Sequence, residues 1–96
     1  YETPWAGIVV SGSQYDREPD VRVVKVYPDT PASKRGIGVG DEIVSFAGEP
    51  VKSADGFASI LARQRTGQMV PIQIKRNGQL IPMRLKLVAM PRDYLF

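Results

Sequence analysis

The sequence predicts an α+β domain, a partly open antiparallel β-barrel or sandwich of five to six strands capped by two helices. Three observations lead to this prediction. The stretch "VPIQIKRNGQLIPMRLKL" contains two alternating runs joined by Asn77-Gly78, the dipeptide best suited to a two-residue hairpin turn. Two other segments carry helix start and stop signals. Strand and helix patterns are mixed along the chain, as in a compact unit whose strands pair with distant partners.

The hairpin prediction fixes a register. If Arg76 lies opposite Gln79, the apolar residues of the two runs face one another on a single side of the sheet. The predicted apolar pairs are Ile74 with Ile81, Ile72 with Met83, and Val70 with Leu85. The polar residues Gln73, Lys75, Arg84 and Lys86 and the prolines Pro71 and Pro82 then face outward, so we expect one wet side of the sheet.

Shorter patterns supply the remaining strands. "VRVVKVY" alternates at Val21, Val23 and Val26, with Val24 out of phase. Glu42 to Ala47 reads as a strand between the turns at Gly40-Asp41 and Gly48, and Val51 reads as a brief further strand.

Two helices are expected between the strands. Pro31 is suited to the first turn of a helix, and Gly36 to its end, which leaves about one turn. Ser53 is a suitable N-cap for a longer helix over 54–65 that Gly67 closes. The apolar spacing on this helix predicts that Phe57 and Ile60 face the core.

Length and composition favour one globular domain over residues 1–96, with a core at about 5–88 and a C-terminal tail at 89–96. The chain has 96 residues, of which 43% are hydrophobic and 24% charged, and its apolar runs stay far below the roughly 20 residues that span a bilayer. We therefore expect no membrane insertion by this segment. Because the chain begins without methionine, we expect it to be a piece of a longer protein.

The residue types limit the chemistry. Cysteine and histidine are absent, which excludes disulfides, thiol and Ser-His-Asp catalysis, and His-ligated metals. A Ser-Lys pair needs no histidine, but the side chains of the adjacent residues Ser33-Lys34 and Lys52-Ser53 do not face each other. We expect no catalysis, cofactor or metal in these residues. The net charge of +3 is dispersed, and the cations of the hairpin read as a solvated face, so nucleic acid is not expected as a partner.

The stretch "PWAGIVVSG" raises a separate question. Gly7 stands between the only tryptophan, Trp5, and the apolar run that begins at Ile8. Alone, this glycine is compatible with an ordinary strand start. It is also compatible with a backbone device whose amide groups serve something other than the fold, because glycine adopts conformations that other residues avoid.

Five landmarks in the correct order resemble a PDZ domain of the bacterial HtrA/DegP-like serine proteases. They are the turn before Pro31-Ala32, the helix end at Gly36-Ile37, the run Gly40-Asp41-Glu42-Ile43, the Gly48 turn and the Arg76-Asn77-Gly78 hairpin. The resemblance covers roughly residues 5–88. It implies a module that binds extended peptides by β-strand addition, with the peptide's C-terminal carboxylate held by a glycine-containing loop.

The resemblance also assigns site residues. The carboxylate loop would be Trp5-Ala6-Gly7-Ile8, and the peptide would pair with Ile8, Val9, Val10, Ser11 and Gly12. Ala54, Ala58 and Leu61 would line the groove side of the longer helix, although Leu61 also fits the core. The pocket for the last peptide side chain, expected to be apolar, would be lined by Ala6, Ile8, Val10 and Leu61. Many eukaryotic PDZ domains have histidine at the first groove position of this helix, which selects Ser or Thr two residues before the peptide's end. Because Ala54 stands at this position, an apolar side chain is expected there instead.

The same resemblance implies partners and a location. Substrate or regulatory peptides would bind by apolar C-termini, beside a serine protease domain in the same chain, in the periplasm or cell envelope. The tail of one copy, ending "DYLF", could also enter the groove of another copy. The alternative is a PDZ-like module that docks subunits in another processing protease or in a secretion system, without specificity for free C-termini.

Overall fold

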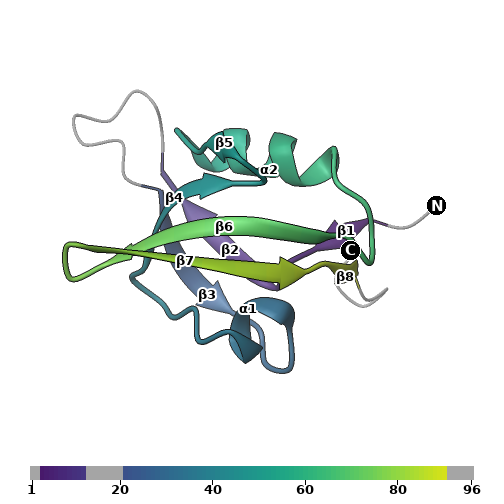
Figure 1. The fold of residues 1–96 in the computed structure, drawn as a ribbon, viewed down its shortest axis with the longest axis horizontal. Helices are drawn as coiled ribbons and strands as arrows, with labels where there is room; N and C mark the ends of the chain where they lie inside the picture. Colours follow the sequence, from purple (N-terminus) through teal and green to yellow (C-terminus); the bar gives the residue numbers. More distant parts are fainter. Residues whose placement is uncertain (1–2, 13–20, 91–96) are drawn as a thin grey trace.

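The computed structural model describes residues 3–12 and 21–90 of the chain, and these form two sheets and two helices (Figure 1). The larger sheet has the strand order β2-β3-β4-β6-β7, with β5 paired to β4, and every recorded strand pair is antiparallel. The smaller sheet pairs β1 with β8. The predicted open antiparallel architecture with two helices is confirmed. The strand bounds are β1 Pro4–Trp5, β2 Ile8–Ser11, β3 Arg22–Val26, β4 Glu42–Phe46, β5 Glu49–Pro50, β6 Met69–Arg76, β7 Gln79–Lys86 and β8 Val88–Ala89.

The β6–β7 hairpin has the predicted register. Arg76 lies opposite Gln79, Ile74 opposite Ile81, and Val70 opposite Leu85. Asn77 and Gly78 both have positive φ, 52° and 80°, as a two-residue type I′ turn requires. The same geometry recurs at Ala47 and Gly48, with φ of 54° and 81°, so β4 ends at Phe46, one residue before the predicted end.

The irregular valine of "VRVVKVY" is a β-bulge. Val9 pairs with Lys25 and Val10 with Val23, so Val24 is the extra residue of β3. Val24 is half exposed, while Val21 and Val23 are buried. The out-of-phase residue in the sequence therefore marks the point where the register shifts.

Both helices start at the predicted positions, and Ser53 is the predicted cap of the longer one. Helix α1 spans Pro31–Lys34, with Thr30 as its N-cap, and helix α2 spans Ala54–Ala62, with Ser53 as its N-cap. Helix α2 ends earlier than predicted, because the N–H groups of Arg63 and Gln64 bond three residues back and tighten the last turn.

Two short segments differ from the sequence prediction. Val51 lies after β5, not within a strand, although its side chain is buried. The paired strands also extend beyond the predicted core, because Ala89 pairs with Pro4 and the Met90 N–H donates to the Thr3 carbonyl at 2.9 Å. The end of the domain therefore pairs with its beginning.

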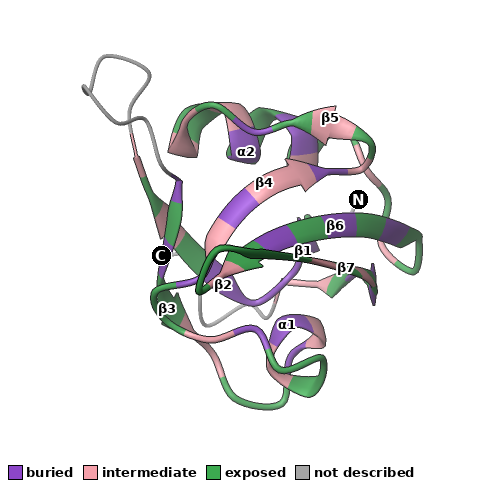
Figure 2. Ribbon diagram, turned by 60° about the vertical axis from the view of Figure 1, so that its left-hand side comes forward, coloured by how far each residue is buried: buried purple, intermediate pink, exposed green. Residues whose placement is uncertain are grey.

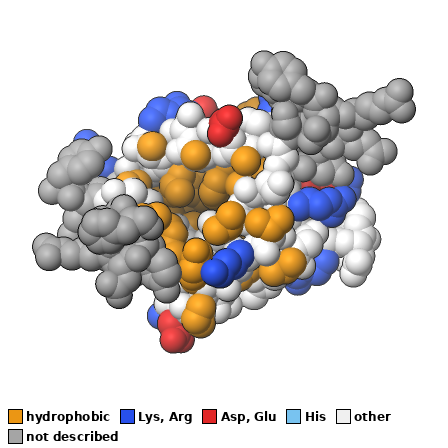
Figure 3. Space-filling view, turned by 180° about the vertical axis from the view of Figure 1, so that it is seen from behind, with side chains coloured by type: hydrophobic (Ala, Val, Ile, Leu, Met, Phe, Trp, Pro, Cys, Tyr) orange, Lys and Arg blue, Asp and Glu red, His pale blue; other side chains and the backbone are white. Residues whose placement is uncertain are grey.

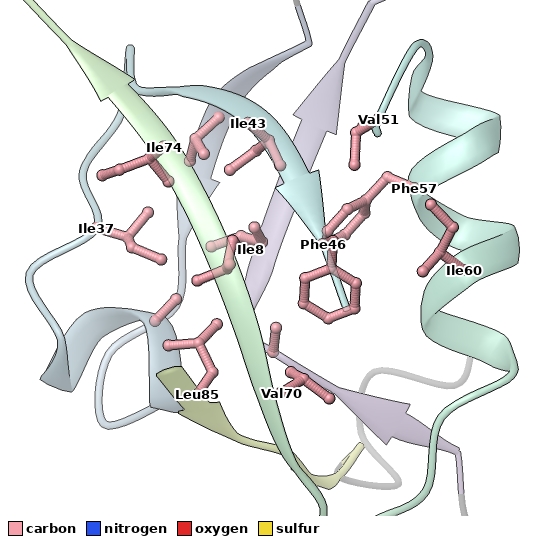
Figure 4. Close-up of a cluster of buried hydrophobic side chains, with 14 of the residues drawn as sticks. Ile8, Ile37, Ile43, Phe46, Val51, Phe57, Ile60, Val70, Ile74 and Leu85 are labelled. Atoms are coloured by element: carbon pink, nitrogen blue, oxygen red, sulfur yellow. The ribbon is translucent and has the colours of Figure 1, made fainter. Parts of the chain in front are cut away.

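The core lies between the larger sheet and the helices (Figures 2 and 4). Helix α2 turns Phe57 and Ile60 inward, as predicted, and the Phe57 ring lies 5.0 Å from the Phe46 ring. Strands β4 and β6 contribute Ile43, Ile72 and Ile74, each at most 1% exposed. Burial of such side chains stabilises the fold by roughly 2 kcal/mol each. Neither helix of the described residues is long and apolar enough to cross a membrane.

Candidate peptide-binding groove

An apolar groove of about 440 Å³ lies between β2 and α2. The space-filling view from behind shows apolar side chains gathered around a hollow (Figure 3). The charged residue of the lining is Asp55, in the first turn of α2. Apolar walls and one carboxylate suit an apolar ligand better than an anionic or strongly polar one. The full lining is Trp5, Ile8, Val9, Val10, Tyr27, Ala54, Asp55, Phe57, Ala58, Leu61 and Met90.

Among the residues that the structure describes, strand β2 has a partner strand on one side only, and its other edge faces this groove. It is the terminal strand of the larger sheet and pairs with β3 on one side. On that side the Tyr27 N–H donates to the Gly7 carbonyl at 2.9 Å. Because bonding groups alternate between the two sides of a strand, the N–H and C=O of Ile8 face away from β3. An edge with unpaired N–H and C=O groups can accept another strand.

The far end of this edge is closed. The Gly12 carbonyl accepts from the Ala54 N–H at 2.9 Å, which ties the chain after β2 to the first residue of α2. Gly12 lies outside β2, which ends at Ser11, so the predicted pairing strand is one residue too long. The open edge therefore comprises the four residues Ile8–Ser11.

The loop that precedes β2 has its carbonyls tied back. The Ala6 carbonyl accepts from the Ala32 N–H of α1 at 3.1 Å, and the Gly7 carbonyl accepts from Tyr27. In a planar trans peptide the C=O and the following N–H point in opposite directions. The N–H groups of Gly7 and Ile8 are thus turned away from α1 and β3, respectively.

Gly7 is required for two reasons, one of which the sequence does not reveal. Its φ is +90°, a conformation that L-residues rarely adopt. In addition, a Cβ at this position would lie 2.2 Å from Thr30 Cβ. Glycine therefore lets the loop turn and also lets α1 approach the loop closely.

Seven of the eleven predicted site residues line the groove, and four do not: Ala6, Gly7, Ser11 and Gly12. Trp5, Ile8, Val9, Val10, Ala54, Ala58 and Leu61 line the groove. Ala6 does not, because its side chain is 1% exposed and lies in the core. Trp5 is 6% exposed and its ring packs 5.2 Å from the Tyr27 ring, as expected of a packing residue, although it also borders the groove.

Sequence reasoning missed two groove residues, Tyr27 and Met90. Tyr27 follows β3 beyond the bulge, and Met90 was assigned to the tail. Neither residue falls in a periodic pattern that indicates the groove. The polar connection over 13–20 and the tail at 91–96, including its predicted contact with another copy's groove, lie outside the described residues.

A larger hollow of about 830 Å³ lies between residues 36–42 and the tip of the β6–β7 hairpin. Its main feature is an ion pair. Arg76 donates from Nε and Nη2 to the Asp41 carboxylate at 2.9 and 2.6 Å, and from Nη2 to the Gly36 carbonyl at 2.8 Å. Hydrogen bonding from Arg76 holds the pKa of Asp41 below its usual range, against the opposing effect of burial. Arg76, predicted as part of a solvated face, therefore anchors the hairpin.

Comparison with known proteins agrees with this geometry. The family model described as PDZ domain matches residues 7–87. Among curated proteins, a probable periplasmic serine endoprotease DegP-like from Pseudomonas putida (strain W619) is 28% identical over 97 residues, covering 93% of this chain and 20% of that protein. Serine protease HTRA1 from Xenopus laevis is 40% identical over 48 residues, which cover 50% of this chain and 10% of that protein.

Solved structures show the same fold. The serine endoprotease from Yersinia pestis matches with a TM-score of 0.80 and 30% identity, over 94% of this chain and 30% of that chain. The HtrA-type protease AlgW with a decapeptide matches with a TM-score of 0.84 and 24% identity, over 94% of this chain and 30% of that chain. The chain thus spans about a fifth of the first curated relative and about a third of the solved chains. It belongs to the PDZ domain family, and its relatives are HtrA-type serine proteases.

Proposed function

We propose that the groove binds an extended peptide as an added strand on β2 and holds the peptide's C-terminal carboxylate at the Trp5–Ile8 loop. The observation that carries this proposal is the orientation of the loop. Its two carbonyls are bonded to α1 and to Tyr27, while the N–H groups of Gly7 and Ile8 point the other way. Within the described residues, the N–H groups of Ala6 and Gly7 donate to no backbone carbonyl. Free N–H groups clustered in this way favour an anion.

The groove supports an apolar final side chain. Ile8, Val10, Phe57 and Leu61 line it, and they leave a site that an aliphatic or aromatic side chain would fill. At the first position of α2, Ala54 presents no polar side chain to the groove, which favours an apolar residue two positions before the peptide's end. The neighbouring Asp55 is the one charged residue of the groove lining. Because the open edge has four residues, we expect about four peptide residues at most to pair with β2.

The relatives support a place in a larger enzyme. Two are named probable periplasmic serine endoproteases, and the solved neighbours include AlgW with a decapeptide and with a tripeptide. We therefore propose that the chain is the peptide-binding module of a periplasmic HtrA-type serine protease. It would hold apolar C-termini of substrates or regulatory peptides beside a protease domain.

A pair of peptides tests the binding mode. Acetyl-Gly-Gly-Val-Ala-Leu with a free carboxylate is titrated into the 96-residue chain, followed by its C-terminally amidated twin, and both affinities are measured by calorimetry. We expect the amide to bind at least about tenfold more weakly, since charge-assisted hydrogen bonds contribute roughly 1.5 kcal/mol or more. Equal affinities, or no binding of either peptide, would favour the subunit-docking alternative. A third peptide with Ser in place of Val should bind more weakly than the first.

A further inference from the structure

We propose that Thr30 is a positioning residue for carboxylate binding, although it lies outside the groove and would touch no ligand. This inference rests on the proposed function and adds a residue that acts through the loop. Thr30 is 4% exposed, one of two buried polar residues in the described part of the chain. Its position next to Gly7 motivates the proposal.

The segment 27–33 holds the loop at both of its carbonyls. Tyr27 donates to the Gly7 carbonyl at 2.9 Å, and Ala32 donates to the Ala6 carbonyl at 3.1 Å. These two bonds fix the planes of the Ala6–Gly7 and Gly7–Ile8 peptides, and therefore the directions of the Gly7 and Ile8 N–H groups. Whatever keeps Tyr27 and Ala32 in place thus also orients the two donors.

Thr30 links these two residues. Its hydroxyl donates to the Tyr27 carbonyl at 2.7 Å, and its Oγ1 accepts from the Ser33 N–H at 3.3 Å. The first bond fixes the residue that holds Gly7, and the second caps the helix that holds Ala6. Helix α1 has only four residues, too few to be stable without its cap and its packing.

The close contact between Thr30 and Gly7 strengthens the link. A Cβ built on Gly7 would lie 2.2 Å from Thr30 Cβ, 2.3 Å from its Oγ1 and 2.6 Å from its Cγ2. The threonine side chain therefore occupies the space that a side chain at position 7 would need. Packing in such a contact transmits small shifts, because protein interiors leave few voids.

Two substitutions of Thr30 separate its hydroxyl from its shape. Thr30→Val keeps the branched shape and removes both hydrogen bonds, whereas Thr30→Ser keeps the hydroxyl and removes a methyl group. We expect Thr30→Val to weaken binding of acetyl-Gly-Gly-Val-Ala-Leu about tenfold, while binding of the amidated twin changes less than about twofold. Thr30→Ser should bind the free acid within about twofold of wild type. Nitrogen-15 NMR of the unliganded chains should show the Gly7 and Ile8 amide signals shifted in Thr30→Val.

Thr66→Val is the matched control. The Thr66 Oγ1 is buried and has no hydrogen-bond partner among the described residues, and Thr66 does not line the groove. The same chemical change at this site should leave the ratio of acid to amide affinity unchanged. If Thr30→Val is partly unfolded, trimethylamine N-oxide, which favours compact states, is added to all variants before titration.

Two failures can be told apart. If wild type binds acid and amide equally, the proposed function is overturned, and the role of Thr30 in carboxylate binding falls with it. If wild type discriminates and Thr30→Val discriminates equally well, with unchanged Gly7 and Ile8 amide signals, only the Thr30 proposal is overturned. In that case Thr30 stabilises the fold and does not position the loop.

Discussion

At the scale of single residues, Gly7 shows how one position can serve the fold and the site together. A substitution at Gly7 is expected to change stability as well as binding, because any side chain would clash with Thr30 and any other residue would have an unfavourable φ. Binding at the loop is better tested with amidated peptides.

Gly7→Ala should lower the free energy of unfolding by about 3 kcal/mol, from backbone strain and from overpacking against Thr30. Gly40→Ala is the matched control, since Gly40 has a similar φ of +96° and a Cβ there would meet nothing within 4 Å. The control should lose only the strain contribution, about 1 kcal/mol. Urea unfolding of both variants measures the difference, and equal losses would contradict the role of Thr30 in excluding a side chain.

Asp41 should make stability depend on pH in the acid range. Its pKa in the folded chain is lowered from the ordinary value of 3.8, chiefly by the hydrogen bond from Arg76. A lowered folded pKa contributes stability that is fully present above the unfolded pKa and is lost as pH falls through the folded pKa. Wild type should therefore exceed Asp41→Asn in stability by a constant amount above about pH 5, and the gap should narrow below about pH 4. Thermal unfolding of both proteins between pH 2 and 7 measures this difference in stability. A difference that does not change with pH would show that ionised Asp41 is not its cause.

At the scale of elements, α2 has separate faces for the core and the groove. Phe57 and Ile60 are buried, whereas Ala58 is exposed and lines the groove. The small alanine side chains at positions 54 and 58 keep the groove open. A substitution on this face can therefore change binding and leave the core intact.

Ala58→Glu should reduce affinity for the free-acid peptide more than about tenfold, because it adds bulk and a negative charge to the groove. Ala62→Glu is the matched control, since Ala62 is exposed, lies one turn further along α2 and does not line the groove. Both variants should unfold within about 1 kcal/mol of wild type. If Ala62→Glu weakened binding as much as Ala58→Glu, the loss would come from the added negative charge and not from contact with the peptide. The proposed position of the peptide beside Ala58 would then be wrong.

The sequence predicted elements best where a few adjacent residues determine the conformation. Asn77-Gly78 with alternating neighbours predicted the complete β6–β7 register, and Ser53 and Pro31 predicted the helix starts. The β1–β8 pair could not be predicted, because two residues in each strand are too few for periodicity. The bulge at Val24 was visible only as an irregularity, since its register depends on the partner strand.

At the scale of the whole molecule, Trp5 connects the two sheets. It belongs to β1, its ring packs on Tyr27 at the end of β3, and it borders the groove. Strand β1 in turn pairs with β8 at the other end of the chain, as Figure 1 shows. Trp5, which directly precedes the loop before β2, is therefore held by the pairing of β1 with β8 and by its packing on Tyr27.

Trp5→Ala should lower the free energy of unfolding by about 3 kcal/mol, as expected for loss of a large buried aromatic side chain. Trp5→Phe, which keeps an aromatic ring against Tyr27, should lose clearly less. Amide hydrogen exchange should also accelerate at Met90, whose N–H donates to Thr3. Unchanged protection at Met90 in Trp5→Ala would show that the β1–β8 pair does not depend on Trp5.

The sequence by itself determined the fold class, the Ser53 cap and the hairpin, because these follow from local conformational preference and periodicity. The residues of the groove were predicted from the resemblance to PDZ domains. Only the tertiary structure decided that Thr30 meets Gly7, that Asp41 pairs with Arg76 from 35 residues away, and that Tyr27 and Met90 border the groove. Such contacts join residues that are far apart in the chain, and local sequence patterns do not predict which distant residues come together. The glycine that the sequence marked as a binding device is held in position by a helix cap more than 20 residues later.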